Sequence, residues 1–528
     1  MAHPSEQRRT FAIISHPDAG KTTLTEKLLL YGGAVHQAGS VKSRKAARAA
    51  TSDWMDIERK RGISVTSSVL QFQRNGYFYN LLDTPGHQDF SEDTYRTLTA
   101  ADCAIMLIDA AKGVEAQTRK LFDVCRKRGT PIVTFVNKLD RPARDSFNLM
   151  SEVEEVLGIH TTPRTWPIGS GDRFKGVYEL DTKQVLLFES SGRGTYRAPV
   201  SVKSLDSEDL VTLIGEEQAK ELRDEVELVE GAGEPYERER FLKGQQTPVF
   251  FGSALNNFGI EPFLDAFVDL CPMPQPQLAG DVIVQPTDTR FSGFIFKVQA
   301  NMDPAHRDRI AFLRVCSGKF ESDIEVNHFR LGKTIRLKRP QGFFGQEREA
   351  IDEAWAGDVI GLFDPGLYRI GDTLSTGSPP LSFETVPRFS PEHFARLQLK
   401  DPMKRKQLQK GIDQLAEEGT VQVFAEKGRE KDPILGVVGR LQFEVLTYRL
   451  EHEYGAKAEI EMLPYSYARW VDGVSQPEEL TAKRIPMAVL DIDGKPVALF
   501  RNDWELSVAV RDNPSWVFNE TAPIRAGG

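Results

Sequence analysis

The sequence predicts an α/β domain with a parallel sheet, followed by an antiparallel β-barrel domain and an α+β ferredoxin-like C-terminal domain. In the first half of the chain, continuous apolar runs such as Cys103 to Ile108 and Ile132 to Val136 alternate with helical sequence. This alternation is typical of parallel strands buried on both faces. Residues 291 to 378 hold short β-rich runs and turns without helical periodicity, which favours a small barrel. Residues 394 to 462 follow the order strand, helix, strand, strand, helix, strand of the ferredoxin-like motif.

The chain length of 528 residues exceeds what one hydrophobic core supports and predicts several domains. The proline-rich stretch from Cys271 to Pro276 cannot continue a helix, so we place the first boundary near residue 278. The segment from 141 to 252 is longer than one helix and loop require, and it predicts a subdomain inserted around residues 165–245. The predicted domains span residues 1–278, 279–388 and 389–528.

Composition limits the partners and the compartment. The 67 lysine and arginine residues face 76 acidic ones, a net charge of −9, so any contact with RNA must be local and DNA is not an expected partner. The four cysteines lie far apart, which predicts reduced thiols without a disulfide framework or a paired metal spacing. No apolar leader or bilayer-length run is present in the sequence. We therefore expect a soluble, monomeric, cytoplasmic protein with no membrane partner.

The first predicted site is the loop SHPDAGKT, which lies between the apolar run Phe11 to Ile14 and a helical pattern. Such a loop turns backbone N–H groups toward one point at a helix N-terminus, where polyphosphate can be held. Lys21 would meet the outer phosphates, and the Thr22 hydroxyl would ligate Mg²⁺. The pattern usually begins with glycine where Ser15 stands, and an ordinary helix-capping loop is the alternative. The predicted phosphate contacts are Ser15, His16, Pro17, Asp18, Ala19, Gly20, Lys21 and Thr22.

The polar segment from about 32 to 62 ends in the sequence RGISVT. Long irregular segments inside compact domains are usually functional. If this segment closes over a γ-phosphate, the hydroxyl of Ser64 or of Thr66 could complete the Mg²⁺ shell. A surface loop with incidental hydroxyls is the alternative for either residue.

The predicted strand Tyr79 to Leu82 leads into a turn at its C-terminal end, where ligands of parallel sheets bind. The Asp83 carboxylate suits Mg²⁺ through a water molecule, and Gly86 would let its N–H approach the γ-phosphate. His87 could position the attacking water as the catalytic residue. A solvated turn histidine is the alternative, and the adjoining Asp-x-x-Gly turn favours catalysis. The predicted nucleotide contacts of this turn are Asp83, Thr84, Pro85, Gly86 and His87.

The run Ile132 to Val136 ends in a third motif, made of Asn137, Lys138, Leu139 and Asp140. The Asp140 carboxylate can accept from the ring N–H and the amine of guanine, a donor pair that adenine lacks, and such a site can reject the wrong base by roughly 10⁴ or more. Asn137 could bind the purine edge or tie loops together, and the Lys138 stem could cover the ring face. The order of the motifs predicts GTP rather than ATP.

A fourth apolar strand, Pro248 to Phe251, leads into Gly252, Ser253 and Ala254. Backbone groups of Ser253 and Ala254 could meet the guanine O6, although this match is weak by itself. Together the four segments predict a P-loop GTPase domain with GTP, GDP and Mg²⁺ as ligands.

The ordered motifs SHPDAGKT, RGIS, DTPGH, NKLD and GSAL resemble the translational GTPases, the family of elongation factors Tu and G, which act on the ribosome. The chain resembles most closely the bacterial members of this family that act in translation termination. The stretches that carry this closer resemblance are Arg9 to Pro17, Asp89 to Thr99 and Phe296 to Arg309. The resemblance covers most of the chain and weakens after about residue 470. It implies Mg²⁺ contacts at Thr22 and Ser64, where relatives usually carry threonine in place of Ser64, and His87 as the water-orienting residue.

The resemblance implies a ribosome-stimulated GTPase that binds ribosomal RNA and ribosomal proteins and stimulates dissociation of class I release factors after peptide release. The alternatives are a translocase like elongation factor G or a ribosome-protection GTPase, which carry about two further domains for which this chain has no room. A non-hydrolysing GTP-dependent binding module is a third possibility, and His87 argues against it. Lys404, Arg405, Lys406 and Lys410 gather on one predicted helix, either as a solvated face or as a ribosome contact.

Overall fold

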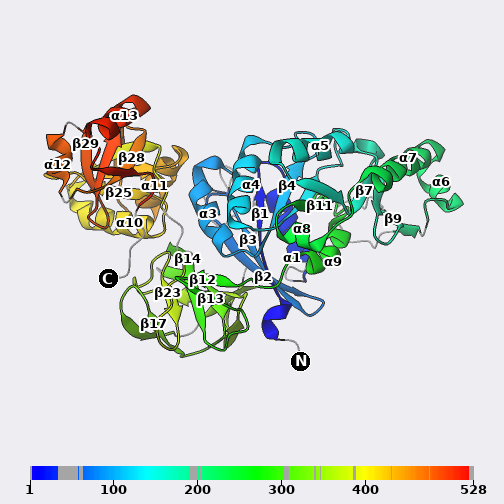
Figure 1. The fold of residues 1–528 in the computed structure, drawn as a ribbon, viewed down its shortest axis with the longest axis horizontal. Helices are drawn as coiled ribbons and strands as arrows, with labels where there is room; N and C mark the ends of the chain where they lie inside the picture. Colours follow the sequence, from blue (N-terminus) through cyan, green and yellow to red (C-terminus); the bar gives the residue numbers. More distant parts are fainter. Residues whose placement is uncertain are drawn as a thin grey trace.

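The computed structural model describes residues 3–33, 58, 64–188, 200–202, 204–300, 309–337, 340–344, 347–384, 388–429, 431–474, 476–483 and 485–522. Most of the polar segment from about residue 32 to 62, and Ile63 of the RGISVT sequence, lie outside the described residues. Residues 301–308 of the stretch from Phe296 to Arg309 also lie outside them. Figure 1 shows three parts, an α/β part, a barrel below it and a C-terminal domain beside both. Within the described ranges, no helix is long and apolar enough to cross a membrane.

The α/β part is built on a sheet with the strand order β2-β3-β1-β4-β5-β11-β6, in which every neighbouring pair is parallel except β2 with β3. The strands are β1 (Arg8–Ser15), β2 (Ser68–Arg74), β3 (Tyr77–Asp83), β4 (Cys103–Asp109), β5 (Ile132–Asn137), β6 (His160–Pro163) and β11 (Gln246–Phe251). The helices are α1 (Lys21–Tyr31), α3 (Ser91–Thr99), α4 (Ala116–Arg128), α5 (Ser146–Leu157), α8 (Arg238–Leu242) and α9 (Ile260–Leu270). Short 3₁₀ turns lie at η1 (Pro4–Gln7) and η2 (Gln88–Phe90). The predicted α/β fold is confirmed.

Alternate residues of the central strands enter different apolar clusters. On β1, Phe11 and Ile13 belong to one buried cluster, whereas Ala12 and Ile14 belong to another. Successive side chains of a strand point to opposite faces, so a strand buried on both faces must be apolar throughout. This is why the continuous apolar runs identified these strands. Cys103 is fully buried in the cluster that contains Phe11 and Ile13, as expected for a strand buried on both faces. All four cysteines are buried, and none forms a disulfide.

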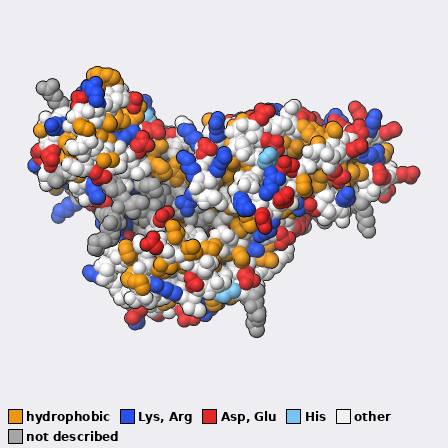
Figure 2. Space-filling model, viewed as in Figure 1, with side chains coloured by type: hydrophobic (Ala, Val, Ile, Leu, Met, Phe, Trp, Pro, Cys, Tyr) orange, Lys and Arg blue, Asp and Glu red, His pale blue; other side chains and the backbone are white. Residues whose placement is uncertain are grey.

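A second, antiparallel sheet with the order β10-β9-β8-β7 extends from the α/β part at the right of Figure 1. Its elements are β7 (Thr165–Ile168), η3 (Gly171–Arg173), β8 (Gly176–Glu179), β9 (Gln184–Leu187) and β10 (Val200–Val202), followed by α6 (Glu208–Ile214) and α7 (Glu216–Ala232). Its apolar cluster surrounds the fully buried Trp166. Figure 2 shows acidic side chains gathered at this end, where α6 and α7 lie. This separate sheet lies within the region from 165 to 245 where the sequence predicts an inserted subdomain, and the subdomain with its boundaries stays a prediction.

The barrel consists of antiparallel strands in the order β18-β17-β23-β14-β15-β22-β19. Its strands are β14 (Ser292–Ala300), β15 (Arg309–Ser317), β17 (Glu325–His328), β18 (Lys333–Arg336), β19 (Gln341–Phe344), β20 (Glu347–Ala350), β22 (Val359–Phe363) and β23 (Thr373–Ser375), with the pairs β12 (Gln277–Ala279) with β13 (Val282–Val284) and β16 (Lys319–Glu321) with β21 (Glu353–Trp355) beside them. Strand β19 also pairs with β2, so that the barrel sheet continues into the α/β sheet. The predicted barrel is confirmed, but this continuity was not expected.

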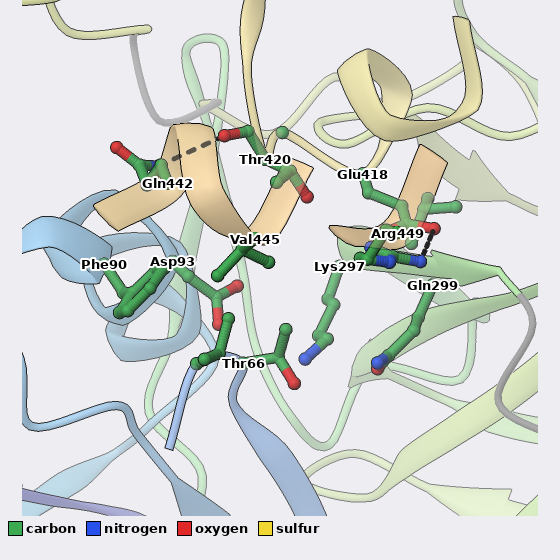
Figure 3. A pocket seen from close by; sticks show the side chains of 13 residues that line it. Thr66, Phe90, Asp93, Lys297, Gln299, Glu418, Thr420, Gln442, Val445 and Arg449 are labelled. Carbon is green, nitrogen blue, oxygen red and sulfur yellow. Dashed lines mark hydrogen bonds and ion pairs between the residues drawn. The ribbon is translucent and has the colours of Figure 1, made fainter. Parts of the chain in front are cut away.

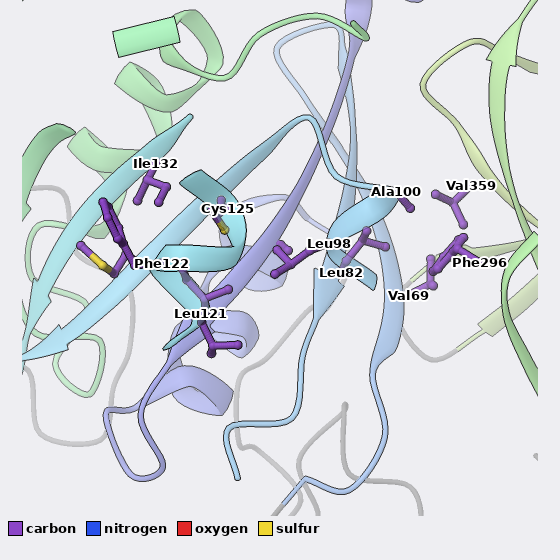
Figure 4. Close-up of a cluster of buried hydrophobic side chains, with 14 of the residues drawn as sticks. Val69, Leu82, Leu98, Ala100, Leu121, Phe122, Cys125, Ile132, Phe296 and Val359 are labelled. Carbon is purple, nitrogen blue, oxygen red and sulfur yellow. The ribbon is translucent and has the colours of Figure 1, made fainter. Parts of the chain in front are cut away.

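The barrel shares an apolar cluster with the α/β part. Figure 4 shows Phe296 and Val359 of the barrel beside Val69, Leu82 and Ala100. The same junction holds a buried ion pair between Asp102 and Arg314, with 2.5 Å between Oδ2 and Nη2. Burial raises the pKa of Asp102 above its usual value, and the Arg314 guanidinium opposes this shift.

The C-terminal domain begins with the predicted βαββαβ order. Its elements are β24 (His393–Leu399), η4 (Pro402–Lys404), α10 (Arg405–Glu417), β25 (Gln422–Ala425), β26 (Ile434–Val437), α11 (Leu441–His452) and β27 (Ala458–Leu463). The strand order β27-β24-β26-β25 is the ferredoxin-like arrangement. After β27 the sheet gains strands that the predicted motif did not include, namely β28 (Tyr467–Asp472), β29 (Met487–Asp491), β30 (Pro496–Phe500) and β31 (Val517–Asn519), with α12 (Pro477–Ala482) and α13 (Asp503–Asp512).

The C-terminal domain contacts both other parts through polar groups around a cavity. Figure 3 shows that this cavity is lined from all three parts of the chain, with Asp93 on one side and Lys297 and Glu418 on the other. The Ala300 N–H of the barrel donates to Glu418 at 2.8 Å, and Arg96 of α3 donates to the Gly419 carbonyl at 3.2 Å. Burial lowers the pKa of Lys297, although Asp93 and Glu418 favour its charged form.

Candidate nucleotide site

The predicted phosphate loop joins the end of β1 to the start of α1. Gly20 is the N-cap of α1 and has a left-handed backbone with φ 99°, a conformation that glycine adopts without a steric penalty. A Cβ at Gly20 would lie 2.4 Å from Asn137 Nδ2. Glycine is therefore required both by the turn and by the close approach of the third predicted motif. The first N–H groups of α1 lack partners within the helix and are suited to anionic oxygens.

Replacing Gly20 with alanine should weaken nucleotide binding by about tenfold or more, because the strained φ and the contact with Asn137 together cost roughly 1–3 kcal/mol. A fluorescent GDP analogue would measure the affinity, and a thermal melt would measure the stability. Gly33→Ala is the matched control, since Gly33 has φ 71° but no atom within 4 Å of an added Cβ. Equal losses in both variants would show that the contact with Asn137 does not matter.

The second motif lies directly against the phosphate loop. Lys21 Nζ is 2.6 Å from Asp83 Oδ1, and both side chains are buried. The Thr84 hydroxyl donates to the Ile13 carbonyl at 2.6 Å. A Cβ at Gly86 would meet Pro17 Cα at 3.5 Å, which is ordinary contact, so Gly86 and Pro17 are neighbours. The structure therefore brings the first two predicted motifs together.

Two buried polar atoms of the loop have no hydrogen-bond partner among the residues that the structure describes. These are Ser15 Oγ and His16 Nδ1. The other ring nitrogen of His16, Nε2, lies 3.1 Å from Glu115 Oε1. Buried polar groups are normally hydrogen-bonded, so atoms of this kind fit a polar ligand held by the loop. Ser15 thus adds a side-chain group at the position where the usual pattern has glycine.

The third motif meets the phosphate loop and the fourth motif. Asn137 Nδ2 donates to the Ala19 carbonyl at 2.9 Å, and the Ala254 N–H donates to Asn137 Oδ1 at 2.9 Å. Asn137 therefore ties loops together, one of the two roles considered for it from the sequence. The Ser253 hydroxyl donates to Asp140 Oδ1 at 2.5 Å. The Leu139 N–H donates to the Gly252 carbonyl at 3.2 Å, which fixes the two loops side by side.

Lys138 has a partner that the sequence did not reveal. Its Nζ lies 2.8 Å from Asp109 Oδ2 at the end of β4, and it also donates to the Asp18 carbonyl. Burial acts to raise the pKa of Asp109, but hydrogen bonds from Lys138 and the Ala111 N–H lower it overall. The charged carboxylate thus holds the Lys138 stem in place. A signal was available, because Asp109 directly follows the apolar run that ends at Ile108.

The two candidate hydroxyls for Mg²⁺ differ in their surroundings. The Val65 and Thr66 N–H groups donate to Glu58 Oε1 at 2.9 and 3.2 Å, and Glu58 is fully buried. Thr66 lines the cavity between the three parts of the chain, as Figure 3 shows. Ser64 is half-buried next to the segment outside the described residues. Thr66 Oγ1 is buried without a hydrogen-bond partner among the described residues, so the structure does not decide between the two, and Ser64 stays the candidate ligand because the resemblance implies it.

His87 caps the short 3₁₀ turn η2 and follows Gly86, the neighbour of the phosphate loop. Its Nδ1 lies 3.3 Å from the Asp89 nitrogen, whose N–H it accepts when unprotonated, and 3.3 Å from Asp89 Oδ1, to which it donates when it carries the proton. The side chain is 33% exposed, so the ring is accessible. Both contacts use Nδ1, which leaves Nε2 for a water molecule.

Comparisons with protein families cover nearly the whole chain. Residues 6–273 match the elongation factor Tu GTP binding domain, and residues 290–377 match elongation factor G domain 2. Residues 383–510 match the C-terminal domain of the class II release factor RF3. The three matches follow the α/β part, the barrel and the C-terminal domain in order.

Individual relatives are similar over their full length. The peptide chain release factor 3 of Symbiobacterium thermophilum is 57% identical over 526 residues, which cover 99% of both chains. That of the Cyanothece strain PCC 7425 is 53% identical over 524 residues, covering 99% of this chain and 96% of the relative. A crystal structure from Thermus thermophilus has a TM-score of 0.69 and 22% identity, and covers 88% of this chain and 69% of that one. This last likeness concerns the fold alone.

Proposed function

The chain belongs to the peptide chain release factor 3 family of translational GTPases, and from this premise we propose that it binds GTP where its four loops meet and hydrolyses it on the ribosome. The contacts that join Lys21 to Asp83 and Asn137 to both Ala19 and Ala254 carry this proposal. This proximity of the four loops supports a single nucleotide site.

Within this site each group has a distinct role. Backbone N–H groups of the phosphate loop, other than at Pro17, which has none, hold the phosphates together with the Lys21 ammonium. Asp140 accepts from the guanine N–H and amine groups. Thr22 and Ser64 would hold Mg²⁺ directly and Asp83 through water, and the bound ion would supply charge neutralisation at the phosphates. The orphaned Ser15 Oγ fits a phosphate oxygen at the same loop.

His87 acts on the water that attacks the γ-phosphorus. Its Nε2 orients that water, the new bond forms between the water oxygen and phosphorus, and the bond to the bridging oxygen of GDP breaks. The products are GDP and inorganic phosphate, which keeps one proton of the attacking water, while the other proton is released to solvent. Donation from the Nδ1–H tautomer to Asp89 Oδ1, at 3.3 Å, fixes the ring orientation that this role requires.

The partners that we propose are the ribosome, through ribosomal RNA and ribosomal proteins, and the class I release factors bound to it. GTP binding would stimulate departure of a class I factor after peptide release, and ribosome-stimulated hydrolysis would release this protein, which acts as a monomer in the cytoplasm. The alternative of a translocase is disfavoured, because residues 383–510 match the release factor C-terminal domain and the relatives share the full length.

A recycling assay tests this function. Ribosomes that have released their peptide and still carry a labelled class I factor are mixed with the full-length protein and GTP. We expect faster exit of the factor with GTP than with GDP. Unchanged exit together with movement of tRNA on the ribosome would overturn the assignment in favour of a translocase.

The choice of Ser64 as the magnesium ligand predicts a difference between two hydroxyl deletions. Ser64→Ala should raise the Mg²⁺ concentration required for half-maximal GTP turnover by about tenfold, the effect of losing ~1.4 kcal/mol of metal binding. Thr66→Ala is the matched control and should leave this concentration unchanged, because Thr66 lines the cavity between domains. A Mg²⁺ titration measures both variants, and Ser64→Thr should behave as the natural protein. The reverse ranking would assign the metal to Thr66.

A further inference from the structure

Asp89 touches both His87 and the C-terminal domain. Its Oδ2 accepts the Leu441 N–H at 2.8 Å, and its Oδ1 lies 3.3 Å from His87 Nδ1. Leu441 is the first residue of α11, whose N-terminus carries partial positive charge and favours a carboxylate at this place. One side chain therefore joins the predicted catalytic turn to a helix 352 residues away.

The chain approaches Asp89 so closely that only glycine fits at position 439. A Cβ added to Gly439 would lie 2.1 Å from Asp89 Cγ. The turn before α11 is held by Gln442, whose Oε1 accepts the N–H groups of Val438 at 2.9 Å and Gly439 at 3.0 Å. The position of Asp89 thus depends on the turn before α11 in the C-terminal domain.

Apolar packing also stabilises the contact between the turn that contains Asp89 and helix α11. Phe90, directly after Asp89, forms a buried cluster with Val65 and with Val445 of α11. Figure 3 shows Phe90 and Val445 on facing sides of the junction. Leu441 packs against this cluster as well. If α11 moves away, the turn loses its polar and its apolar support together.

We propose that Asp89 is a positioning residue through which the docked C-terminal domain orients His87 for GTP hydrolysis. With α11 in place, the Leu441 N–H donates to the Asp89 carboxylate, the carboxylate accepts from the Nδ1–H tautomer of His87, and the Nε2 lone pair is left to accept from the attacking water. With α11 displaced, the carboxylate is released and the ring loses its orientation. The rate of GTP hydrolysis then depends on whether the C-terminal domain is docked on the α/β part. This inference rests on the proposed function of His87.

Three substitutions in the full-length protein test this link. Asp89→Ala and Gly439→Ala should each lower kcat for hydrolysis at saturating ribosomes by about 10- to 100-fold, the loss expected for one hydrogen bond to a charged group. The affinity for GTP and the KM for ribosomes should stay unchanged. Asp89→Asn should recover part of kcat, because its amide oxygen can still accept the Leu441 N–H. The double variant Asp89→Ala with Gly439→Ala should be no slower than the slower single one.

The control is Gly231→Ala, which adds a Cβ on α7 with no atom within 4 Å and should leave kcat unchanged. Thermal melts confirm that each variant is folded. An unchanged kcat in Gly439→Ala beside a reduced one in Asp89→Ala would overturn the link to the C-terminal domain, as would additive effects or a rise confined to the KM for ribosomes. An unchanged kcat in His87→Ala would instead refute the proposed role of His87.

Discussion

Replacing His87 with alanine should lower ribosome-stimulated GTP hydrolysis by about 10²- to 10⁴-fold, the range that one positioned acid–base side chain contributes. The affinity for GTP should stay unchanged, since the phosphate and guanine contacts lie in other loops. Single-turnover hydrolysis on ribosomes measures the first quantity, and titration with a fluorescent GTP analogue measures the second. The expected signature is therefore a protein that binds nucleotide normally and fails to turn it over.

His160→Ala is the matched control for this experiment. His160 belongs to the same part of the chain and is exposed at the edge strand β6. Its removal should leave both quantities unchanged. Full turnover in His87→Ala would remove His87 from catalysis, while the recycling activity, which depends on GTP binding, would be unaffected by that result.

Replacing Asp140 with asparagine should lower the preference for GTP by roughly 10⁴ and raise the affinity for xanthosine triphosphate. Guanine presents two donors to the carboxylate, whereas xanthine presents an acceptor where guanine has its amine, and an asparagine amide can donate to it. Competition between the two nucleotides for the purified protein measures the change. The amide oxygen can still accept the Ser253 hydroxyl, which lies 2.5 Å from Asp140 Oδ1, so the loop should keep its shape.

Asp123→Asn, on the exposed face of α4, is the control for the charge removed and should keep the preference for GTP. Undiminished selectivity for GTP in Asp140→Asn would show that another group reads the base. In that case the contact between Ser253 and Asp140 would be structural only.

Much of the fold follows from local pattern. The strands β1, β3, β4 and β5 were predictable because burial on both faces requires continuous apolar sequence, and the motifs were predictable because ligands bind at the ends of such strands. The ferredoxin-like order was also legible, since α10 buries Leu408, Ile412 and Leu415 at helical spacing, although the buried face of α11 also contains Gln442 and Arg449. The roles of the individual site residues stay predictions.

The remaining features depend on contacts between distant residues, which local pattern does not encode. Nothing near Asp89 in sequence points to Gly439, because the reason for that glycine lies on another domain. The pairing of β19 with β2 joins two domains through backbone groups, which any sequence provides. The strands after β27 were not predicted, although β29 and β30 hold the short apolar runs Met487 to Leu490 and Val497 to Phe500.

The two junctions of the α/β part differ in how strongly they resist separation. Moving the barrel away would break a continuous sheet and expose a large apolar cluster, at about 25 cal/mol for each Å² of apolar surface. Moving the C-terminal domain away would expose a small apolar cluster and several ionic groups that water hydrates well. Large rearrangements of this protein should therefore be rigid-body displacements of residues 388–522. Small-angle X-ray scattering would record them as a changed radius of gyration with unchanged secondary structure.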